Sequence, residues 1–346
     1  MNEYSDARQH LNLSSLAYDV LNSDKYEFLE KPSFARIVNM VLSSYMEDSD
    51  ASIDNAMLRY ERRLRETLAN IPDDATKKSV MWALLEQYRS ELLSAANGHP
   101  REVAFKVRLD QNNYSAVQEW HDYNDYYSGI PGNFLKAVIE EYARKPLFER
   151  EGILLRDTID EINACISSHQ LVIITLKGQN RSRYEVRPYS IEHDPGFNYH
   201  YLVGYSRKAG TDFEEKPASF RLSRIIGIKR SHARSGKVTT EQKREIKKKL
   251  QSDGVQFLLQ ESEPIRLKLT IRGKQMYESQ AHLRPPFIQR EECADGSWIF
   301  EFNCTQMQAE YYFFKFGNEA VVETPVDLRN RLSNKYHDAY ETYRQE

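Results

Sequence analysis

The chain has 346 residues, 40% of them hydrophobic, which is enough to build the buried cores of two or three domains. Its formal net charge of −3 argues against a protein that coats polyanions through overall positive charge. Its apolar runs fall short of the roughly 18 residues that a membrane span needs, and its first residues lack the basic-then-apolar shape of a signal peptide.

The three cysteines, Cys165, Cys293 and Cys304, are odd in number and share no CxxC spacing. This usage is typical of reduced thiols, so we expect a cytoplasmic protein with no membrane partner.

Motifs for catalysis are missing from the sequence. It contains no Gly-rich phosphate loop, no HExxH, no nucleophile elbow and no metal-spaced set of Cys and His. The nearest candidate is Glu192-His193-Asp194 with His200 nearby, and the turn sequence DPGFN explains Asp194 without any chemistry. We therefore expect no enzymatic activity, no metal and no cofactor.

Charge is distributed unevenly. Residues 1–50 hold 4 Lys and Arg against 9 Asp and Glu, whereas residues 181–236 hold 11 against 6. The basic segment contains two strand-like runs, YHYLVGYSR at 199–207 and FRLSRIIGIKRS at 220–231. An unpaired guanidinium is costly to bury, so these strands are interpreted as the wall of a site for an anionic polymer or ligand.

Residues 10–45 predict a short strand followed by two helices, with Ser15 as the N-cap of the first helix and Ser33 as that of the second. The same order returns in FKVRLDQNNYSAVQEWHDY and IPGNFLKAVIEEYARK. Shifted by 96 residues, the apolar positions Leu11, Leu13, Tyr18 and Leu21 fall on Val107, Leu109, Tyr114 and Val117. Shifted by 97, Val38, Val41, Leu42 and Tyr45 fall on Leu135, Val138, Ile139 and Tyr142. We expect an internal duplication; the alternative is two unrelated helical hairpins.

Each copy resembles a ribbon-helix-helix module, whose single strand must pair with that of a second copy. The resemblance implies that the two copies pair within one chain and that the outward face of their strands enters the DNA major groove. It also implies phosphate contacts at helix N-termini near Ser33 and Asn133. The implied groove-facing residues are His10, Asn12 and Ser14 in the first copy and Lys106, Arg108 and Asp110 in the second. Because the first copy is acidic, the alternative is a module kept only for assembly.

Between the copies, about residues 51–100 predict an inserted helical hairpin that is broken at Pro72-Asp73-Asp74. Its basic run RYERRLRE, which starts at Arg59, is interpreted as a solvated helix face.

Residues 156–231 predict a helix and four strands rich in Val, Ile and Tyr, which favours a small barrel. Three of the strands resemble a WYL domain through Val186-Arg187-Pro188, His200-Tyr201-Leu202 and Phe220-Arg221-Leu222-x-Arg224-Ile225. His200 stands where that family usually has Trp, and Ser223 where it often has Asp. The resemblance implies an Sm-like β-barrel with a pocket for nucleic acid or a nucleotide-like ligand. The implied pocket residues are Tyr201, Arg221 and Arg224, supported by Tyr184 and His200.

The residue types agree with such a pocket. Each guanidinium can bind a phosphate in bidentate fashion, and Tyr201 can stack a base, which is worth about 1–3 kcal/mol. Arg221 and Arg224 lie three apart, so on an unbroken strand they point to opposite faces. The alternative is that both arginines pair with local carboxylates such as Glu185 or Glu192.

Thr239 and Gln242 have the spacing of a capping box, at the start of a Lys-rich helix interpreted as a solvated face. Strands at 265–271, 297–304 and 320–325 then alternate with helices, in a βαββα-like, ferredoxin-like order. The stretch FGNEAVVETPVDLRNRL resembles the carboxyl-terminal extension found after many WYL domains, which implies a homodimer. Arg272, Arg284 and Arg290 would extend the basic groove.

The sequence thus predicts an α+β multidomain protein: a tandem ribbon-helix-helix-like region (1–150), a WYL barrel (151–236) and a dimerising extension (237–346). This order resembles the WYL-domain accessory proteins of type VI-D CRISPR systems. The resemblance implies binding of single-stranded RNA or DNA in the WYL pocket and enhancement of an RNA-guided, RNA-cleaving effector nuclease. One alternative is a ligand-responsive transcriptional regulator that reads duplex DNA through its ribbon strands, and another is a protein–protein adaptor.

Overall fold

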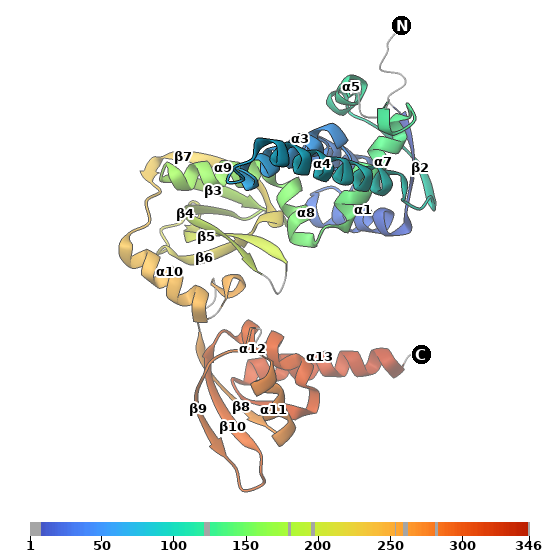
Figure 1. Cartoon of the computed structure of the whole chain (residues 1–346). Coiled ribbons are helices and arrows are strands. Elements are labelled where there is room, and N and C mark those ends of the chain that lie inside the picture. Colours follow the sequence, from blue (N-terminus) through green and yellow to red (C-terminus); the bar gives the residue numbers. More distant parts are fainter. Residues whose placement is uncertain are drawn as a thin grey trace. The chain divides into compact units, whose positions relative to one another are not determined.

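The computed structural model describes residues 8–120, 125–178, 181–194, 198–252, 254–258, 262–280 and 283–344. The expected helix residues 121–123 and 281–282 and the expected turn at 195–197 lie outside these ranges. Within them, helices combine with three antiparallel sheets of two, five and four strands, so the protein is α+β (Figure 1). Contacts divide the chain into two units, Met1–Asp157 and Thr158–Glu346. No helix in the described ranges is long and apolar enough to cross a bilayer.

A two-stranded ribbon begins the first unit. β1 (Arg8–Leu13) pairs antiparallel with β2 (Val103–Arg108), with His10 opposite Lys106 near the centre. The predicted pairing of the two strands within one chain is therefore confirmed. The register also agrees with the predicted repeat, because the 96-residue shift carries His10 onto its own partner, Lys106.

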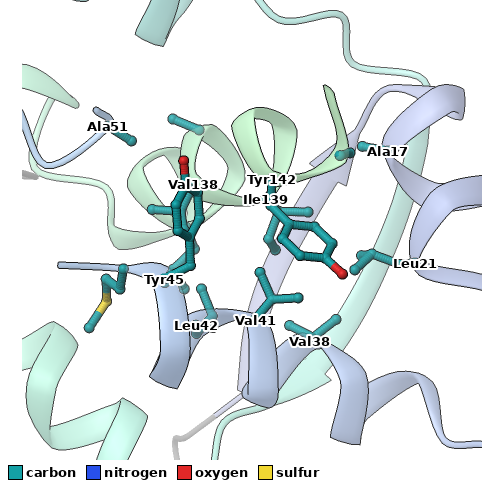
Figure 2. Packing of buried hydrophobic residues seen from close by; sticks show 14 of the residues in the cluster. Ala17, Leu21, Val38, Val41, Leu42, Tyr45, Ala51, Val138, Ile139 and Tyr142 are labelled. Atoms are coloured by element: carbon teal, nitrogen blue, oxygen red, sulfur yellow. The ribbon is translucent and has the colours of Figure 1, made fainter. Parts of the chain in front are cut away.

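Each strand is followed by two helices at equivalent positions. α1 (Ser15–Phe28) and α2 (Phe34–Tyr45) follow β1, and α5 (Gln111–Glu119) and α7 (Pro131–Arg144) follow β2. The first helices of the copies start 96 residues apart and the second helices 97 apart, as the apolar pattern predicts. Equivalent stripes of α2 and α7 are buried: Ile37, Val38, Val41, Leu42 and Tyr45 on one, and Phe134, Leu135, Val138, Ile139 and Tyr142 on the other (Figure 2).

The helix starts correct two of the expected groove-facing positions. α1 is capped by Ser14 and not by Ser15, because the Ser14 Oγ accepts the amide of Ala17 at 3.1 Å. At the equivalent position, Asp110 caps α5 by accepting the amide of Asn113 at 2.9 Å. Ser14 and Asp110 therefore cap helices and do not face outward from the ribbon.

Carboxylates of each copy accept hydroxyls of the other, and one of these carboxylates, Asp24, is buried. The Tyr142 hydroxyl donates to Asp24 at 2.7 Å, and Arg150 donates to both oxygens of Asp24 at 2.8 and 3.1 Å. In the reverse direction, the Tyr45 hydroxyl of the first copy donates to Glu141 of the second. Burial, followed by the neighbouring carboxylate, raises the pKa of both tyrosines, so both remain hydrogen-bond donors.

The inserted hairpin consists of α3 (Ile53–Thr67) and α4 (Asp74–Asn97), and the repeat is followed by α8 (Leu147–Leu154). The hairpin's basic run is only partly a solvated face. Arg59 donates to the backbone carbonyls of Glu47, Asp48 and Ser49 at 3.0–3.2 Å and pairs with Asp50 at 3.3 Å. Arg59 therefore fastens α3 to the loop that follows α2.

The second unit starts with α9 (Arg156–Ser167) and a five-stranded sheet of order β6-β5-β4-β3-β7. The strands are β3 (Gln170–Leu176), β4 (Arg183–Asp194), β5 (Tyr199–Lys208), β6 (Lys216–Arg221) and β7 (Ile225–Ser235). The single strand expected over 219–230 is thus two strands, joined by a 3₁₀ turn at Leu222–Arg224. In a flat sheet β6 and β7 would lie about 19 Å apart, while the four Cα-to-Cα steps from Arg221 to Ile225 span at most about 14 Å, so the sheet must curl. The ring of Tyr184 on β4 accordingly meets that of Phe220 on β6, with centroids 5.1 Å apart.

α10 (Thr240–Ser252) begins with the predicted capping box. The Thr239 Oγ1 accepts the amide of Gln242 at 3.2 Å, and the Gln242 side chain accepts the amide of Thr239 at 2.9 Å. Ile246 of α10 is buried in one cluster with Tyr201 and Tyr205 of β5 and with residues of a short 3₁₀ turn, Val255–Phe257. α10 therefore covers one face of β5.

The last sheet has the order β11-β8-β10-β9. Its elements are β8 (Glu263–Leu269), α11 (Ile271–Ser279), β9 (Phe287–Glu292), β10 (Trp298–Cys304), α12 (Gln306–Phe313), β11 (Ala320–Thr324) and α13 (Val326–Arg344). This is the β-α-β-β-α-β order of a split β-α-β sheet, with α13 added. The sequence analysis missed β9, an edge strand whose six residues are all exposed and which therefore lacks an alternating pattern.

Candidate nucleic-acid interface

The outward face of the ribbon is the first candidate site. Arg8 and His10 of β1 and Lys106 and Arg108 of β2 are all exposed there, in two directly opposed pairs. Opposed residues on one face of antiparallel strands stand about 5 Å apart, so these four nitrogen-bearing side chains share one patch. The remaining outward pair is Asn12, which is half-buried, and Ala104, so none of the six outward positions of the paired strands is a carboxylate.

Arg8 is the residue that the sequence analysis missed. The strand was expected to begin at His10, whereas pairing with Arg108 extends it to Arg8. The alternation of polar and apolar residues stops at His10, because Gln9 is polar, so no pattern in the sequence indicates Arg8.

Two close contacts hold the ribbon on its helices. The Asn39 side chain of α2 donates to the carbonyl of Arg108 at 3.0 Å and accepts the amide of Asp110 at 2.8 Å. Gly132, in the first turn of α7, lies so close to β1 that an added Cβ would stand 2.7 Å from the carbonyl oxygen of His10. The patch therefore stands on a backbone that is fixed at both strands.

The two expected phosphate-binding helix ends differ. Ser33 caps α2 through the amide of Arg36 at 3.4 Å. α7 begins at Pro131 after Ile130, which makes no side-chain cap, and Asn133 donates instead to the carbonyl of Tyr127 at 3.4 Å.

The face of the five-stranded sheet that carries Arg221 is the second candidate site. Tyr201 lies directly opposite Arg221 on the neighbouring strand, as a shared pocket requires. Tyr201 is only 8% exposed, however, because it packs in the cluster beneath α10. A covered ring has no free face for a base, so the expected stacking role of Tyr201 does not fit the structure. The half-exposed Tyr199 lies nearer the solvent, with the Arg221 guanidinium carbon 3.2 Å from its ring centroid.

Three other expected pocket residues lie elsewhere. His200 and Tyr201 are consecutive on β5, so their side chains point to opposite faces of the sheet. Tyr184 contacts Phe220, the neighbour of Arg221, and so also lies on the face opposite Arg221. Arg224 is exposed in the 3₁₀ turn. The break between β6 and β7 separates it from Arg221, and the five residues do not line one pocket.

Two carboxylates near the five-stranded sheet are engaged by other arginines. Glu185, an expected partner of Arg221 or Arg224, pairs with Arg207 at 2.7 Å. This hydrogen bond raises the pKa of Arg207. Arg187 pairs with Glu215 at 2.8 Å. Pairing with Glu185 therefore does not account for Arg221 or Arg224.

The arginines proposed to extend the groove are mostly used within the last sheet. Arg284 donates to the carbonyl of Glu278 at 3.1 Å and lies 5.4 Å from the ring centroid of Tyr277. Arg290 pairs with the Glu278 carboxylate at 3.4 Å, while Arg272 is exposed.

Two histidines lie opposite each other on neighbouring strands of the five-stranded sheet. His193 and His200 are opposite each other on β4 and β5, with ring centroids 5.4 Å apart. Among the residues that the structure describes, no group of three or more His, Cys, Asp and Glu could hold a metal ion.

No protein-family model matches the chain, and no curated protein matches it. Among solved structures, a CRISPR Cas-related protein is similar, with a TM-score of 0.73 at 24% identity over 98% of this chain and 94% of that chain. The two proteins thus share a fold over nearly their whole lengths. The proteasome accessory factor B/C (PafBC) of Arthrobacter aurescens matches with a TM-score of 0.29 at 12% identity, over 66% of this chain and 35% of that chain.

Proposed function

We propose that this protein is a non-enzymatic, nucleic-acid-binding regulator of a CRISPR system. The observation that carries the proposal is the outward ribbon face, where Arg8, His10, Lys106 and Arg108 are exposed together without a carboxylate. The fold shared with a CRISPR Cas-related protein supports the cellular context. By its resemblance to the accessory proteins of type VI-D systems, its action is enhancement of an RNA-guided, RNA-cleaving effector nuclease.

The ribbon favours duplex DNA as one ligand. The major groove of B-DNA, about 12 Å wide, admits a two-stranded ribbon, and arginine and lysine there can bind the O6 and N7 of guanine. The major groove of A-form RNA is too narrow for side chains to read. A ligand-responsive DNA-binding regulator therefore remains the alternative function.

The barrel supports single-stranded RNA or DNA as a second ligand. Arg221 lies half-exposed over the ring of Tyr199, so this edge of the sheet offers a cation for the phosphates of a flexible strand. This ligand fits an accessory protein of an effector that cleaves RNA.

Fluorescence anisotropy at 50 and 200 mM salt tests both sites, with labelled duplex DNA, single-stranded DNA and single-stranded RNA. The variant Arg8→Ala/Arg108→Ala is expected to weaken duplex binding, and Arg221→Ala to weaken single-strand binding. Arg62→Ala, an exposed arginine of α3, is the matched control. Failure of the wild-type protein to bind any of the three would refute the proposal and favour a protein–protein adaptor.

The effector role needs its own measurement. Adding the protein to an RNA-guided, RNA-cleaving effector is expected to raise the cleavage rate, and Arg221→Ala to reduce that gain. The homodimer implied by the carboxyl-terminal resemblance is checked by light scattering.

A further inference from the structure

α10 presents a row of cations to solvent. Lys243, Arg244, Lys247 and Lys248 are exposed, whereas Ile246 of the same helix is completely buried. At 100° per residue, the four side chains project within an arc of about 140° on the side away from Ile246. Within the described part of the chain, none of the four makes an ion pair or a side-chain hydrogen bond.

This lack of pairing sets the four apart from many other cations of the second unit. Ion pairs engage Arg187 with Glu215 at 2.8 Å, Arg207 with Glu185 at 2.7 Å and Arg230 with Glu161 at 3.5 Å. On α10 itself, the Glu245 carboxylate accepts the Tyr205 hydroxyl on the side of β5. Glu241, in the first turn, is the remaining carboxylate near the arc. The arc therefore keeps most of its positive charge for an external partner.

The arc is also held in a fixed position. The capping box starts the helix, Ile246 anchors it in the cluster with Tyr201, and Tyr205 bonds it to β5. A rise of 1.5 Å per residue places Lys243 and Lys247 about 6 Å apart, and Arg244 and Lys248 likewise. The four cations thus form two parallel pairs on a rigid element.

Phosphate is the ligand group that this arc suits. Its exposed positions carry no apolar side chain. It therefore lacks both the apolar face of a membrane-binding helix and the apolar or aromatic residues that are buried at the centre of a protein interface. Lysine presents a compact point charge with rotatable donors, which matches a flexible chain of phosphates.

The position of α10 indicates which nucleic acid it binds. Tyr199, which stacks on Arg221, also packs against the cluster that contains Ile246. A single strand with a phosphate at Arg221 would therefore lead its backbone toward α10. We propose that the exposed arc of α10 is a sequence-independent binding surface for the phosphate backbone of single-stranded nucleic acid. The inference rests on the nucleic-acid binding proposed above and assigns part of it to α10.

The test compares salt dependence between variants. Replacing the four cations together by alanine preserves the helix, because alanine has the highest helix propensity. Each phosphate contact to a single strand contributes about 0.7 to the slope of log K against log salt, so the quadruple variant should lose up to about 2.8 of that slope. The probes are labelled 20-nucleotide RNA and DNA single strands, titrated from 50 to 200 mM salt.

A charge-matched pair makes the result specific. Lys243→Ala/Lys247→Ala is compared with Arg62→Ala/Lys77→Ala, which removes two cations from the helical hairpin of the first unit. Only the Lys243→Ala/Lys247→Ala variant should reduce the magnitude of the slope of log K against log salt, by up to about 1.4. A quadruple variant with wild-type affinity and slope would overturn this inference while leaving the proposed function intact. A labelled polyglutamate that binds the wild-type chain as tightly as the single strands, and whose binding the quadruple variant weakens equally, would overturn the inference in favour of an acidic protein partner. No binding by the wild-type chain would overturn both proposals.

Discussion

Replacing Gly132 by alanine should loosen the ribbon even though alanine favours helices. Gly132 lies in the first turn of α7, and its added Cβ would stand 2.7 Å from the carbonyl oxygen of His10. Real Cβ atoms do not approach backbone oxygens so closely, so α7 or β1 must shift. Overpacking of this kind costs about 1–3 kcal/mol, against a gain of about 1 kcal/mol from helix propensity. We expect a net loss of up to about 2 kcal/mol.

Gly152 provides a matched control. It also lies in a helix of the first unit, α8, and an added Cβ there would meet no atom within 4 Å. Gly152→Ala should therefore stabilise the unit by about 0.5–1 kcal/mol, through helix propensity alone. The two glycine-to-alanine changes are predicted to have opposite signs.

Urea unfolding followed by circular dichroism measures both variants. With a slope near 2 kcal/mol per M, a loss of up to about 2 kcal/mol lowers the midpoint by up to about 1 M. Hydrogen exchange of peptides from β1 should accelerate in Gly132→Ala, because the displaced carbonyl belongs to that strand. A Gly132→Ala protein as stable as Gly152→Ala, with unchanged exchange in β1, would refute the close approach on which the reasoning depends.

Two further predictions concern the polar groups of the first unit. Arg150→Ala leaves the Asp24 carboxylate, 1% exposed, without its cation and should destabilise the unit by about 3–5 kcal/mol; an unchanged thermal midpoint would contradict this. Burial, and then the charge of Arg144, lowers the pKa of His99 below its ordinary 6.5. The unfolded chain then binds the proton at a higher pH than the folded one, so this contribution to stability is complete above about pH 6.5 and declines as the pH falls below it. His99→Gln should flatten the decline, and an identical pH profile for both proteins would show that His99 does not cause it.

The repeat could be predicted from the sequence because burial imposes a period on the residues. The inward stripe of α2, such as Val38 and Val41, recurs in α7 as Leu135 and Val138, and all four are fully buried. The pairing of the two strands followed from the same requirement, since one strand with two helices cannot cover its own apolar face. The cap of α1 was misplaced by one residue because two adjacent serines offer the same hydroxyl, and only backbone geometry selects Ser14.

The candidate site in the barrel was harder to predict because it depends on contacts between distant residues. Nothing near Tyr201 in the sequence shows that α10, about 40 residues later, buries its ring. Apolar residues stand near both ends of the 3₁₀ turn, at Phe220 and Ile225, and Leu222 lies within it. The run therefore lacks the Gly or Pro that usually marks a break between strands. In a curled sheet the chain can change direction at buried residues. Arg221 therefore ends β6 and Arg224 lies in the turn, whereas the sequence analysis placed both on one strand.

The polar groups of the repeat explain why its two halves are not interchangeable. Tyr45 and Tyr142 occupy equivalent positions, yet each donates its hydroxyl to a carboxylate of the other half, Glu141 and Asp24. Neither carboxylate is itself duplicated, because Ser44 stands 97 residues before Glu141 and Trp120 stands 96 after Asp24. Each tyrosine thus uses a different carboxylate position, and the two halves have diverged at this contact. The outward face has diverged in the same way, since one end of the ribbon pairs Arg8 with Arg108 and the equivalent end pairs Asn12 with Ala104. A symmetric dimer must present the same residues at both ends of its ribbon, whereas a fused repeat can concentrate its cations at one end.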